Sequence, residues 1–509
     1  MGKKRKKRQR QLMEEQAKSV MPEVKKKSFL QEFCPILIII LLILAAVPRI
    51  KAVQDPPVRS FDEGLYNYVG TQLKYQPFNY SSSGFFKIMS PHIHDKKEWE
   101  RVKRYVDVPL FKHPPVYSYL IAIAKKFFGD GYMPANAVSL FTGIGTILAV
   151  YLLCKYLWGE AWGLLAAFFI AIEPLYWLCS QKIWIETTVG FFVYLGILFL
   201  LLGQKKEKVE YFVLSGVSFG LSILCKYPAA LVLFSVYSVL LFSDIIKNRK
   251  LLALYICIPF IVGIPWALWI YKVYGSIFTS IADIFSPEGP GTSTFKEFQK
   301  FILIGSIPVF ILVAIIAIKC FFIDISNKVG TFLKKILEYP AVKNGLFLAI
   351  MIIFCALLME SGNHILQALN WKHIAVPTNM MNPFRGSPSY FYFYHFVTIS
   401  LLFLIAYFSV LFFKKWDKWI YIFALIPILY FVVFGMYKEY EARYVIIATP
   451  ALMILAVYTI KEAIAVFANK TGMKKTIPIC IIVLFIVYAV AKTLYFDFTI
   501  VAKNNFFFF

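Results

Sequence analysis

The chain contains 509 residues, of which 59% are hydrophobic and only 16% are charged, and its mean hydropathy is +0.66. An ordinary soluble domain carries roughly 45–50% apolar and about 25% charged residues, so this composition excludes such a domain and predicts a polytopic membrane protein. The net charge is +25, but the basic residues lie mostly in short runs between apolar segments. That distribution is typical of cytoplasmic connections and argues against binding of nucleic acid.

The N-terminal segment is strongly basic. It begins MGKKRKKRQR, and we expect residues 1–28 to form a disordered cytoplasmic tail. The apolar run Cys34–Val47 follows, and we interpret it as a retained first span because the basic region of a cleaved signal peptide is usually shorter. One membrane domain over residues 29–494 and a short outer tail over residues 495–509 complete the predicted organisation.

The apolar runs predict an all-α protein with about thirteen transmembrane helices. A membrane helix needs about 20 mostly apolar residues. The candidate spans are residues 33–48, 136–154, 161–178, 183–202, 209–225, 227–242, 251–272, 302–322, 344–359, 391–413, 419–436, 444–460 and 477–493.

The positions of Lys and Arg predict that the N-terminus is inside and the C-terminus outside. Every connection that this topology assigns to the cytoplasm carries Lys or Arg, whereas the short outer loops carry fewer. The break at Cys225–Pro228 decides whether the number of spans is odd or even, because one continuous helix there would reverse the direction of every later span. No internal repeat suggests an inverted-repeat transporter.

Three longer loops then face the outer side: residues 49–135, 273–301 and 360–390. The first is by far the largest. Within it, residues 63–73, 95–105 and 115–128 have the pattern of short helices lying at the membrane interface.

The first outer loop opens with adjacent carboxylates, Asp62 and Glu63. Carboxylates near a membrane surface are costly to desolvate, so they usually have a partner or a chemical task. The alternative is that they favour a helix N-terminus, where acidic residues are stabilised.

Further candidates fall on the same outer side. Lys112 and His113 precede two prolines and could bind a phosphate or a metal, although a lone histidine is more often structural. Glu186 lies at membrane depth, where an ionisable group is a functional candidate, and the alternative is a structural ion pair with Lys182.

Two further cations belong to the same set. Lys226 lies in a tight outer turn, where it could hold a lipid phosphate or simply extend to the interface. Arg443 could bind a phosphate with two parallel hydrogen bonds, or pair with a neighbouring glutamate. The sequence shows no tight metal-ligand spacing, so no cofactor is certain and a divalent metal stays open.

In this order, the motifs resemble the GT-C superfamily, and more closely the dolichyl-phosphate-mannose protein mannosyltransferase and aminoarabinose transferase group. The matching elements are Asp62-Glu63 with Tyr66, His113-Pro114-Pro115-Val116-Tyr117, Tyr156-Leu157-Trp158-Gly159, Ile172-Glu173-Pro174-Leu175 followed by Ser180 and Glu186, Gly220-Leu221-Ser222 with Lys226-Tyr227, and Arg443-Tyr444 with Pro450. Two departures are Ala135-Asn136-Ala137, where many relatives carry an Arg, and His113, where a Lys is common.

The resemblance implies a GT-C fold and a glycosyltransferase that moves a hexosyl or pentosyl group from a polyprenyl-phosphate donor. The acceptor would be a protein, lipid or glycan hydroxyl on the extracytoplasmic face of the cell membrane. By the same resemblance, Asp62 would be the catalytic base with Glu63 beside it.

The resemblance also implies roles for the other candidates. Lys226, Arg443 and Lys112 would hold the donor phosphate, and His113, Glu186 and Tyr66 would contact substrate. Because the leaving group is a phosphate, it needs cations and one base, whereas a glycosidase needs a pair of carboxyl groups. Direct displacement predicts inversion at the sugar.

Two other function classes stay open. A polymerase or ligase of lipid-linked glycans shares many spans and large outer loops, but would not need the early acidic pair. A transporter or flippase would be expected to show charged or broken helices at the membrane midplane, whereas here the ionisable residues lie toward span ends.

Overall fold

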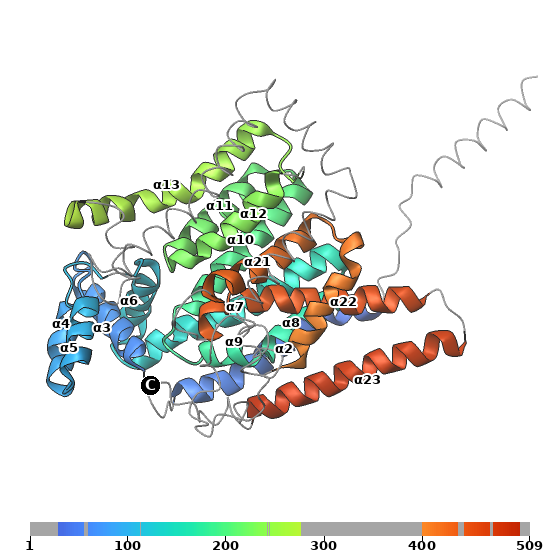
Figure 1. Ribbon diagram of the computed structural model, residues 1–509, viewed down its shortest axis with the longest axis horizontal. Coiled ribbons are helices and arrows are strands. Elements are labelled where there is room, and N and C mark those ends of the chain that lie inside the picture. Colours follow the sequence, from blue (N-terminus) through green and yellow to red (C-terminus); the bar gives the residue numbers. More distant parts are fainter. Residues whose placement is uncertain are drawn as a thin grey trace, which may run out of the picture.

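The structure is a computed structural model that describes residues 29–54, 60–111, 113–241, 243, 245–275, 400–435, 442–468 and 472–498. All regular secondary structure in these ranges is helical (Figure 1). The α-helices are α2 (Phe29–Gln54), α3 (Phe61–Tyr75), α4 (Ser83–Met89), α5 (Lys96–Val106), α6 (Val116–Phe128), α7 (Tyr132–Trp158), α8 (Glu160–Ala171), α9 (Pro174–Cys179), α10 (Glu186–Lys206), α11 (Val209–Ile223), α12 (Ala230–Leu241), α13 (Arg249–Tyr274), α20 (Leu401–Tyr407), α21 (Lys418–Gly435), α22 (Ala448–Ala468) and α23 (Met473–Phe496). Short 3₁₀ helices are η1 (Ser90–His92), η2 (Tyr227–Ala229), η3 (Phe408–Lys415) and η4 (Ala442–Val445).

Long apolar helices confirm a multi-pass membrane protein. Among the described residues, 6 helices are long and apolar enough to cross a membrane, namely α2, α7, α10, α13, α22 and α23. Shorter apolar helices lie at Glu160–Ala171, Val209–Ile223, Tyr227–Leu240 and Lys418–Phe431.

One predicted span needs correction. Residues 161–178 do not form one continuous helix, because α8 ends at Ala171 and α9 begins at Pro174. Glu173 caps α9: its carboxylate accepts hydrogen bonds from the backbone N–H groups of Leu175 at 3.1 Å and Tyr176 at 2.6 Å. Pro174 has no N–H to continue the preceding helix, so the apolar run breaks although its composition is uninterrupted.

The other predicted spans have different outcomes. The break at Cys225–Pro228 is confirmed, since α11 ends at Ile223 and η2 begins at Tyr227. Predicted spans 302–322 and 344–359, like the tail over residues 1–28, lie outside the described residues. Span 391–413 falls partly outside them, and its described part is the short α20 followed by η3. The count of thirteen therefore stays a prediction.

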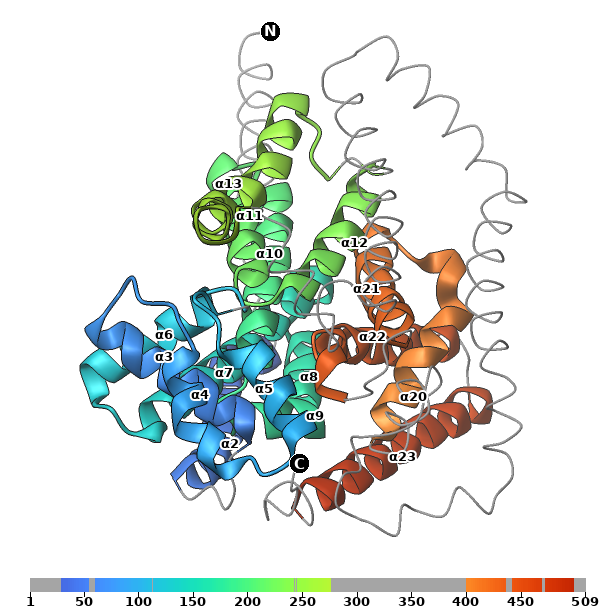
Figure 2. The ribbon, with the colours of Figure 1, turned by 60° about the vertical axis from the view of Figure 1, so that its left-hand side comes forward.

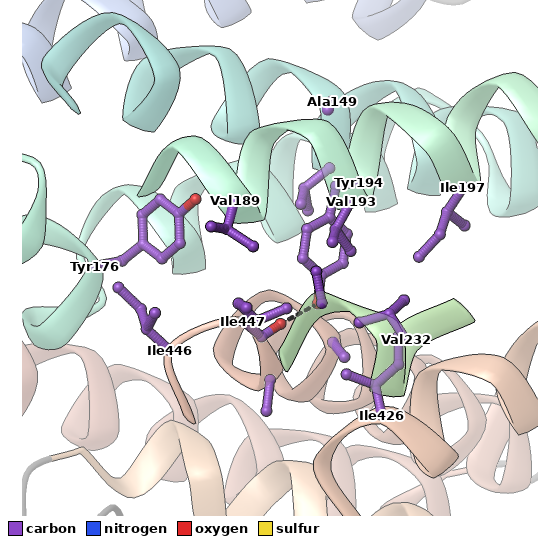
Figure 3. Close-up of a cluster of buried hydrophobic side chains, with 14 of the residues drawn as sticks. Ala149, Tyr176, Val189, Val193, Tyr194, Ile197, Val232, Ile426, Ile446 and Ile447 are labelled. Carbon is purple, nitrogen blue, oxygen red and sulfur yellow. Dashed lines mark hydrogen bonds between the residues drawn. The ribbon is translucent and has the colours of Figure 1, made fainter. Parts of the chain in front are cut away.

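The helical body has two groups of helices that share one core. In the first group, α8 packs on α7, α7 on α10, α10 on α11, and α11 on α13; in the second, α20 and α21 each pack on α22 (Figures 1 and 2). Figure 3 shows the contact between the two groups of helices, where Val193 and Ile197 of α10 face Ile447 and Ile426. There the Tyr194 hydroxyl donates a hydrogen bond to the backbone oxygen of Ile447 at 2.8 Å, which satisfies a buried polar group.

The long loop that follows α2 folds into short helices, as the sequence predicts for residues 63–73, 95–105 and 115–128. Helices α3 to α6 lie together at one side of the body (Figure 2). Helix α3 packs on α6, and α6 packs on α7, so the loop is fixed to the membrane helices. This packing holds the N-terminus of α3 against the body.

Arg49 fixes the break between α8 and α9. Its buried guanidinium donates hydrogen bonds to the backbone oxygens of Ala45 at 2.7 Å and Ala171 at 2.8 Å, and to Ser180 Oγ at 3.1 Å. It also lies over the ring of Trp177, 4.8 Å from its centroid. The unpaired carbonyl at the end of α8 is thereby satisfied by a residue of α2.

We expect Arg49→Met to destabilise the protein strongly. The variant leaves the buried carbonyl oxygen of Ala171 and the buried hydroxyl of Ser180 without the donor that Arg49 supplies, and each buried polar group left unsatisfied costs about 1–3 kcal/mol. The midpoint of thermal unfolding of the purified protein measures the effect. Lys74→Met is the matched control, because its ion pair with Asp130 lies at the surface, where water and salt screen it and its loss should change the stability little. Equal losses in the two variants would contradict the assignment.

Candidate functional site

The N-terminus of α3 forms a capping box. Ser60 Oγ accepts a hydrogen bond from the backbone N–H of Glu63 at 3.4 Å, and Glu63 Oε2 accepts one from the backbone N–H of Ser60 at 2.8 Å. Glu63 Oε1 accepts a third, from the backbone N–H of Ile183 at 3.2 Å. Glu63 is buried, and each of its carboxylate oxygens accepts a hydrogen bond from a backbone N–H group. Asp62, beside it, is only half-buried and extends toward other charged side chains.

The segment that carries His113 is fixed by its backbone. The Tyr80 hydroxyl lies 3.1 Å from the backbone oxygen of His113 and 3.2 Å from that of Pro114, and the backbone N–H of Val116 donates to Leu224 at 3.0 Å. The imidazole packs edge-on against Tyr66, with ring centroids 5.8 Å apart. Tyr66 therefore contacts a predicted site residue, whereas Lys112 lies outside the described residues.

The turn before α10 brings in a third segment. Residues 180–185 are buried, and Ser139 Oγ of α7 donates a hydrogen bond to the backbone oxygen of Trp184 at 2.9 Å. The indole N–H of Trp184 donates to Ser60 Oγ at 3.2 Å. Because α10 starts at Glu186, this carboxylate lies at the helix N-terminus, where the helix dipole stabilises it.

Two ion pairs join these segments to the remaining candidates. Lys226 Nζ lies 2.9 Å from Glu186 Oε1, so the predicted pair of Glu186 with Lys182 is replaced here by one with Lys226. Arg443 Nη1 lies 2.8 Å from Asp62 Oδ2, while the glutamates of its own loop, Glu439 and Glu441, lie outside the described residues. The structure thus brings together Asp62 and Arg443, from opposite ends of the sequence.

The two pairs share an aromatic residue. The Tyr444 ring centroid is 5.3 Å from Lys226 Nζ and 5.7 Å from Arg443 Cζ. Arg443 also lies over the ring of Trp184, with Cζ 4.9 Å from its centroid. Such cation–π contacts stabilise a cation by about 0.5–2 kcal/mol. Sequence reasoning did not assign roles to Tyr444 and Trp184, although each stands in a motif that it singled out.

The site sets the protonation of its two outer-loop groups. Burial alone would raise the pKa of the Asp62 carboxyl, but the charge and hydrogen bond of Arg443, helped by His113 and Lys226, hold it below its usual range. Burial, with the positive charge of Lys226, lowers the pKa of His113 to about 4 against the smaller opposing effect of Asp62 and Glu186. At pH 7 the Asp62 carboxyl is therefore ionised and the His113 imidazole is neutral.

The described side chains do not by themselves fit a divalent metal. Among them, no group of three or more His, Cys, Asp and Glu residues lies close enough to hold one. Asp62 and Glu186 each direct an oxygen at a cationic side chain, which opposes a metal at the same position.

The chain is similar to known proteins both in sequence pattern and in fold. The sequence pattern of a family described as dolichyl-phosphate-mannose-protein mannosyltransferase matches residues 112–269, less than half of the chain. This region includes His113, Glu186 and Lys226. None of the curated protein sequences compared with the chain matches it significantly.

Among solved structures, the chain is similar to an oligosaccharyltransferase from Archaeoglobus fulgidus, with a TM-score of 0.53 and 16% identity over 94% of this chain. It spans only 57% of the length of that protein. A second similar structure is the archaeal oligosaccharyltransferase AglB from Archaeoglobus fulgidus, in complex with an inhibitory peptide and a dolichol-phosphate. Its TM-score is 0.51 at 17% identity, and the match covers 93% of the present chain and 56% of AglB. The chain is also similar to ArnT from Cupriavidus metallidurans bound to undecaprenyl phosphate, with a TM-score of 0.50 and 14% identity. This match covers 92% of the present chain and 77% of ArnT.

At these identities the likeness concerns the fold. The predicted fold class, an all-α polytopic membrane protein of the GT-C type, is confirmed, and so is the resemblance to GT-C glycosyltransferases on which the prediction rests.

We expect the His113 imidazole not to titrate between about pH 5.5 and 8, because its pKa of about 4 lies far below the ordinary value of about 6.5. The measurement is NMR of protein labelled at its 6 histidines, with the His113 resonance identified by its loss in His113→Gln. That resonance should shift only as the pH falls toward 4. A midpoint near 6.5 would contradict the described environment.

Proposed function

We propose that the chain is a glycosyltransferase that moves a sugar from a polyprenyl-phosphate carrier to an acceptor hydroxyl on the non-cytoplasmic side of the membrane. The observation that supports this most is the convergence of Asp62, Glu186, Lys226 and Arg443 in a fold similar to that of membrane glycosyltransferases. One carboxylate with cations is what displacement of a phosphate needs.

The cations act on the leaving group. As the bond between the anomeric carbon and the phosphate oxygen breaks, negative charge develops on the phosphate. Lys226 and Arg443 would stabilise that charge, and Lys112 would do so from the segment before His113. A phosphate leaving group stabilised in this way needs no acidic carboxyl group to protonate it.

Asp62 is the proposed base. It would accept the proton of the acceptor hydroxyl as the acceptor oxygen bonds to the anomeric carbon, and direct displacement then inverts the configuration of that carbon. Glu63 would support this role by tying the N-terminus of α3 to the turn before α10, since Oε2 accepts from the backbone N–H of Ser60 and Oε1 from that of Ile183. His113, Glu186 and Tyr66 would contact the sugar or the acceptor.

The proposed sidedness rests on the distribution of Lys and Arg. With the N-terminus inside, the segments that carry Asp62, His113, Glu186, Lys226 and Arg443 all face the non-cytoplasmic side. A polyprenyl tail could then stay in the bilayer while its phosphate meets the cations at the membrane surface. The sugar, and the choice among protein, lipid and glycan acceptors, need experiment.

Transfer from radiolabelled polyprenyl-phosphate sugars, in membranes carrying the protein, tests the proposal. We expect Asp62→Asn to lower the rate by about 100-fold or more, the usual contribution of a general base, at unchanged expression. Asp130→Asn is the matched control, because it removes a surface carboxylate of the same loop. We expect it to retain the wild-type rate.

Two other outcomes would contradict the role of Asp62 or the transferase itself. Equal transfer by wild type and Asp62→Asn would move the base to another carboxylate, with Glu186 as the next candidate. No transfer from a broad panel of donors by folded protein would contradict the transferase and favour a ligase or a transporter.

A further inference from the structure

Both described cations of the site are already paired with carboxylates. Arg443 lies 2.8 Å from Asp62, and Lys226 lies 2.9 Å from Glu186. A donor phosphate that binds these cations must therefore compete with a carboxylate or use the remaining N–H groups of the cation. The two pairs are not equally able to open.

Burial separates the two pairs. The Glu186 side chain is 4% exposed and that of Lys226 is 16% exposed, and Glu186 Oε2 has no hydrogen-bond partner among the described residues. Opening this pair would leave a buried carboxylate with neither a cation nor water, which is costly. Lys226 can remain on Glu186 and offer its other N–H groups to a phosphate.

The Asp62 pair can open at lower cost. The Asp62 side chain is 31% exposed, so the carboxylate meets water when it leaves Arg443. Arg443 does not depend on Asp62 for its position, because its guanidinium lies over the rings of Trp184 and Tyr444. Trp184 is in turn fixed to Ser60 by a hydrogen bond of 3.2 Å. The guanidinium can thus exchange one anion for another without moving away.

Resting on the proposed function, we propose that the donor phosphate replaces Asp62 on Arg443, and that this exchange releases Asp62 to act as the base. While Arg443 is bound to it, the carboxylate is a poor proton acceptor. Once released, it takes the proton of the acceptor hydroxyl. The acceptor oxygen then bonds to the anomeric carbon, and the bond to the phosphate oxygen breaks, so that the polyprenyl phosphate leaves with the electron pair.

Donor binding therefore precedes activation of the acceptor. In the chain without donor, Arg443 keeps Asp62 inactive as a base. Lys226 and Glu186 form a fixed pair throughout, and only the pair from Asp62 to Arg443 changes partner. This division of roles follows from the exposure of the two carboxylates and not from their order in the sequence.

Binding of polyprenyl phosphate to the full-length protein in lipid nanodiscs tests the exchange. If Asp62 competes with the phosphate for Arg443, Asp62→Asn should bind polyprenyl phosphate about two- to fivefold more tightly than wild type, the effect expected for removal of a partly exposed competing charge. Asp130→Asn, which removes a carboxylate from the Lys74 pair, should bind as wild type does.

A double-mutant cycle separates competition from a general change in charge. Arg443→Gln should weaken binding, and in that background Asp62→Asn should have no further effect, because the shared guanidinium is gone. A general electrostatic effect would instead persist in the Arg443→Gln protein. If Asp62→Asn destabilises the protein, Asp62→Ser serves in the same cycle.

The outcomes distinguish the exchange from the function on which it rests. Failure of the wild type to bind polyprenyl phosphate would overturn both. Binding by the wild type, with Asp62→Asn equal to it or weaker, would overturn the exchange and leave the transferase in place. A gain in affinity that survives in the Arg443→Gln background would also overturn the exchange.

Discussion

The ion pair between Asp62 and Arg443 is the contact on which the rest of the site depends. It joins the first turn of α3, in the large outer loop, to η4 in the C-terminal half of the described chain. A charged group near hydrocarbon is costly unless paired, so each residue balances the charge of the other. The pairing links the long loop after α2, which helix packing already holds on the body, to a segment far away in the sequence.

Beneath this ion pair, buried charged side chains bind backbone groups at the ends of helices. Glu63 uses both carboxylate oxygens for backbone N–H groups, one set at the start of α3 and one in the turn before α10. Arg49 similarly satisfies the carbonyl end of α8 and reaches Ser180 in the same turn. The adjacent acids Asp62 and Glu63 thus have different tasks. Glu63 binds backbone with both oxygens, whereas Asp62 is 31% exposed and pairs with the side chain of Arg443.

The fold and the site suit chemistry at a membrane surface. Lys226 and Arg443 share the ring of Tyr444, so two like charges are held close together without a direct contact between them. His113 stays neutral beside them, because burial and the charge of Lys226 oppose its protonation. The net result is a pair of cations, each balanced by a carboxylate, that an incoming phosphate can engage without a large excess of unpaired charge.

The sequence by itself determined the membrane class, most span positions within the described residues and the short helices of the long loop after α2, and it named the candidate residues that the structure brings together. These properties follow from local patterns: apolar length, Lys and Arg placement, and the prolines beside His113. Only the tertiary structure decided the partners. Local patterns could not show that Glu186 pairs with Lys226 instead of Lys182, that Arg443 pairs with the distant Asp62, or that Glu173 breaks the run 161–178. The physical reason is that ion pairing and backbone satisfaction depend on which ends of helices meet in space, and helix packing alone fixes that meeting.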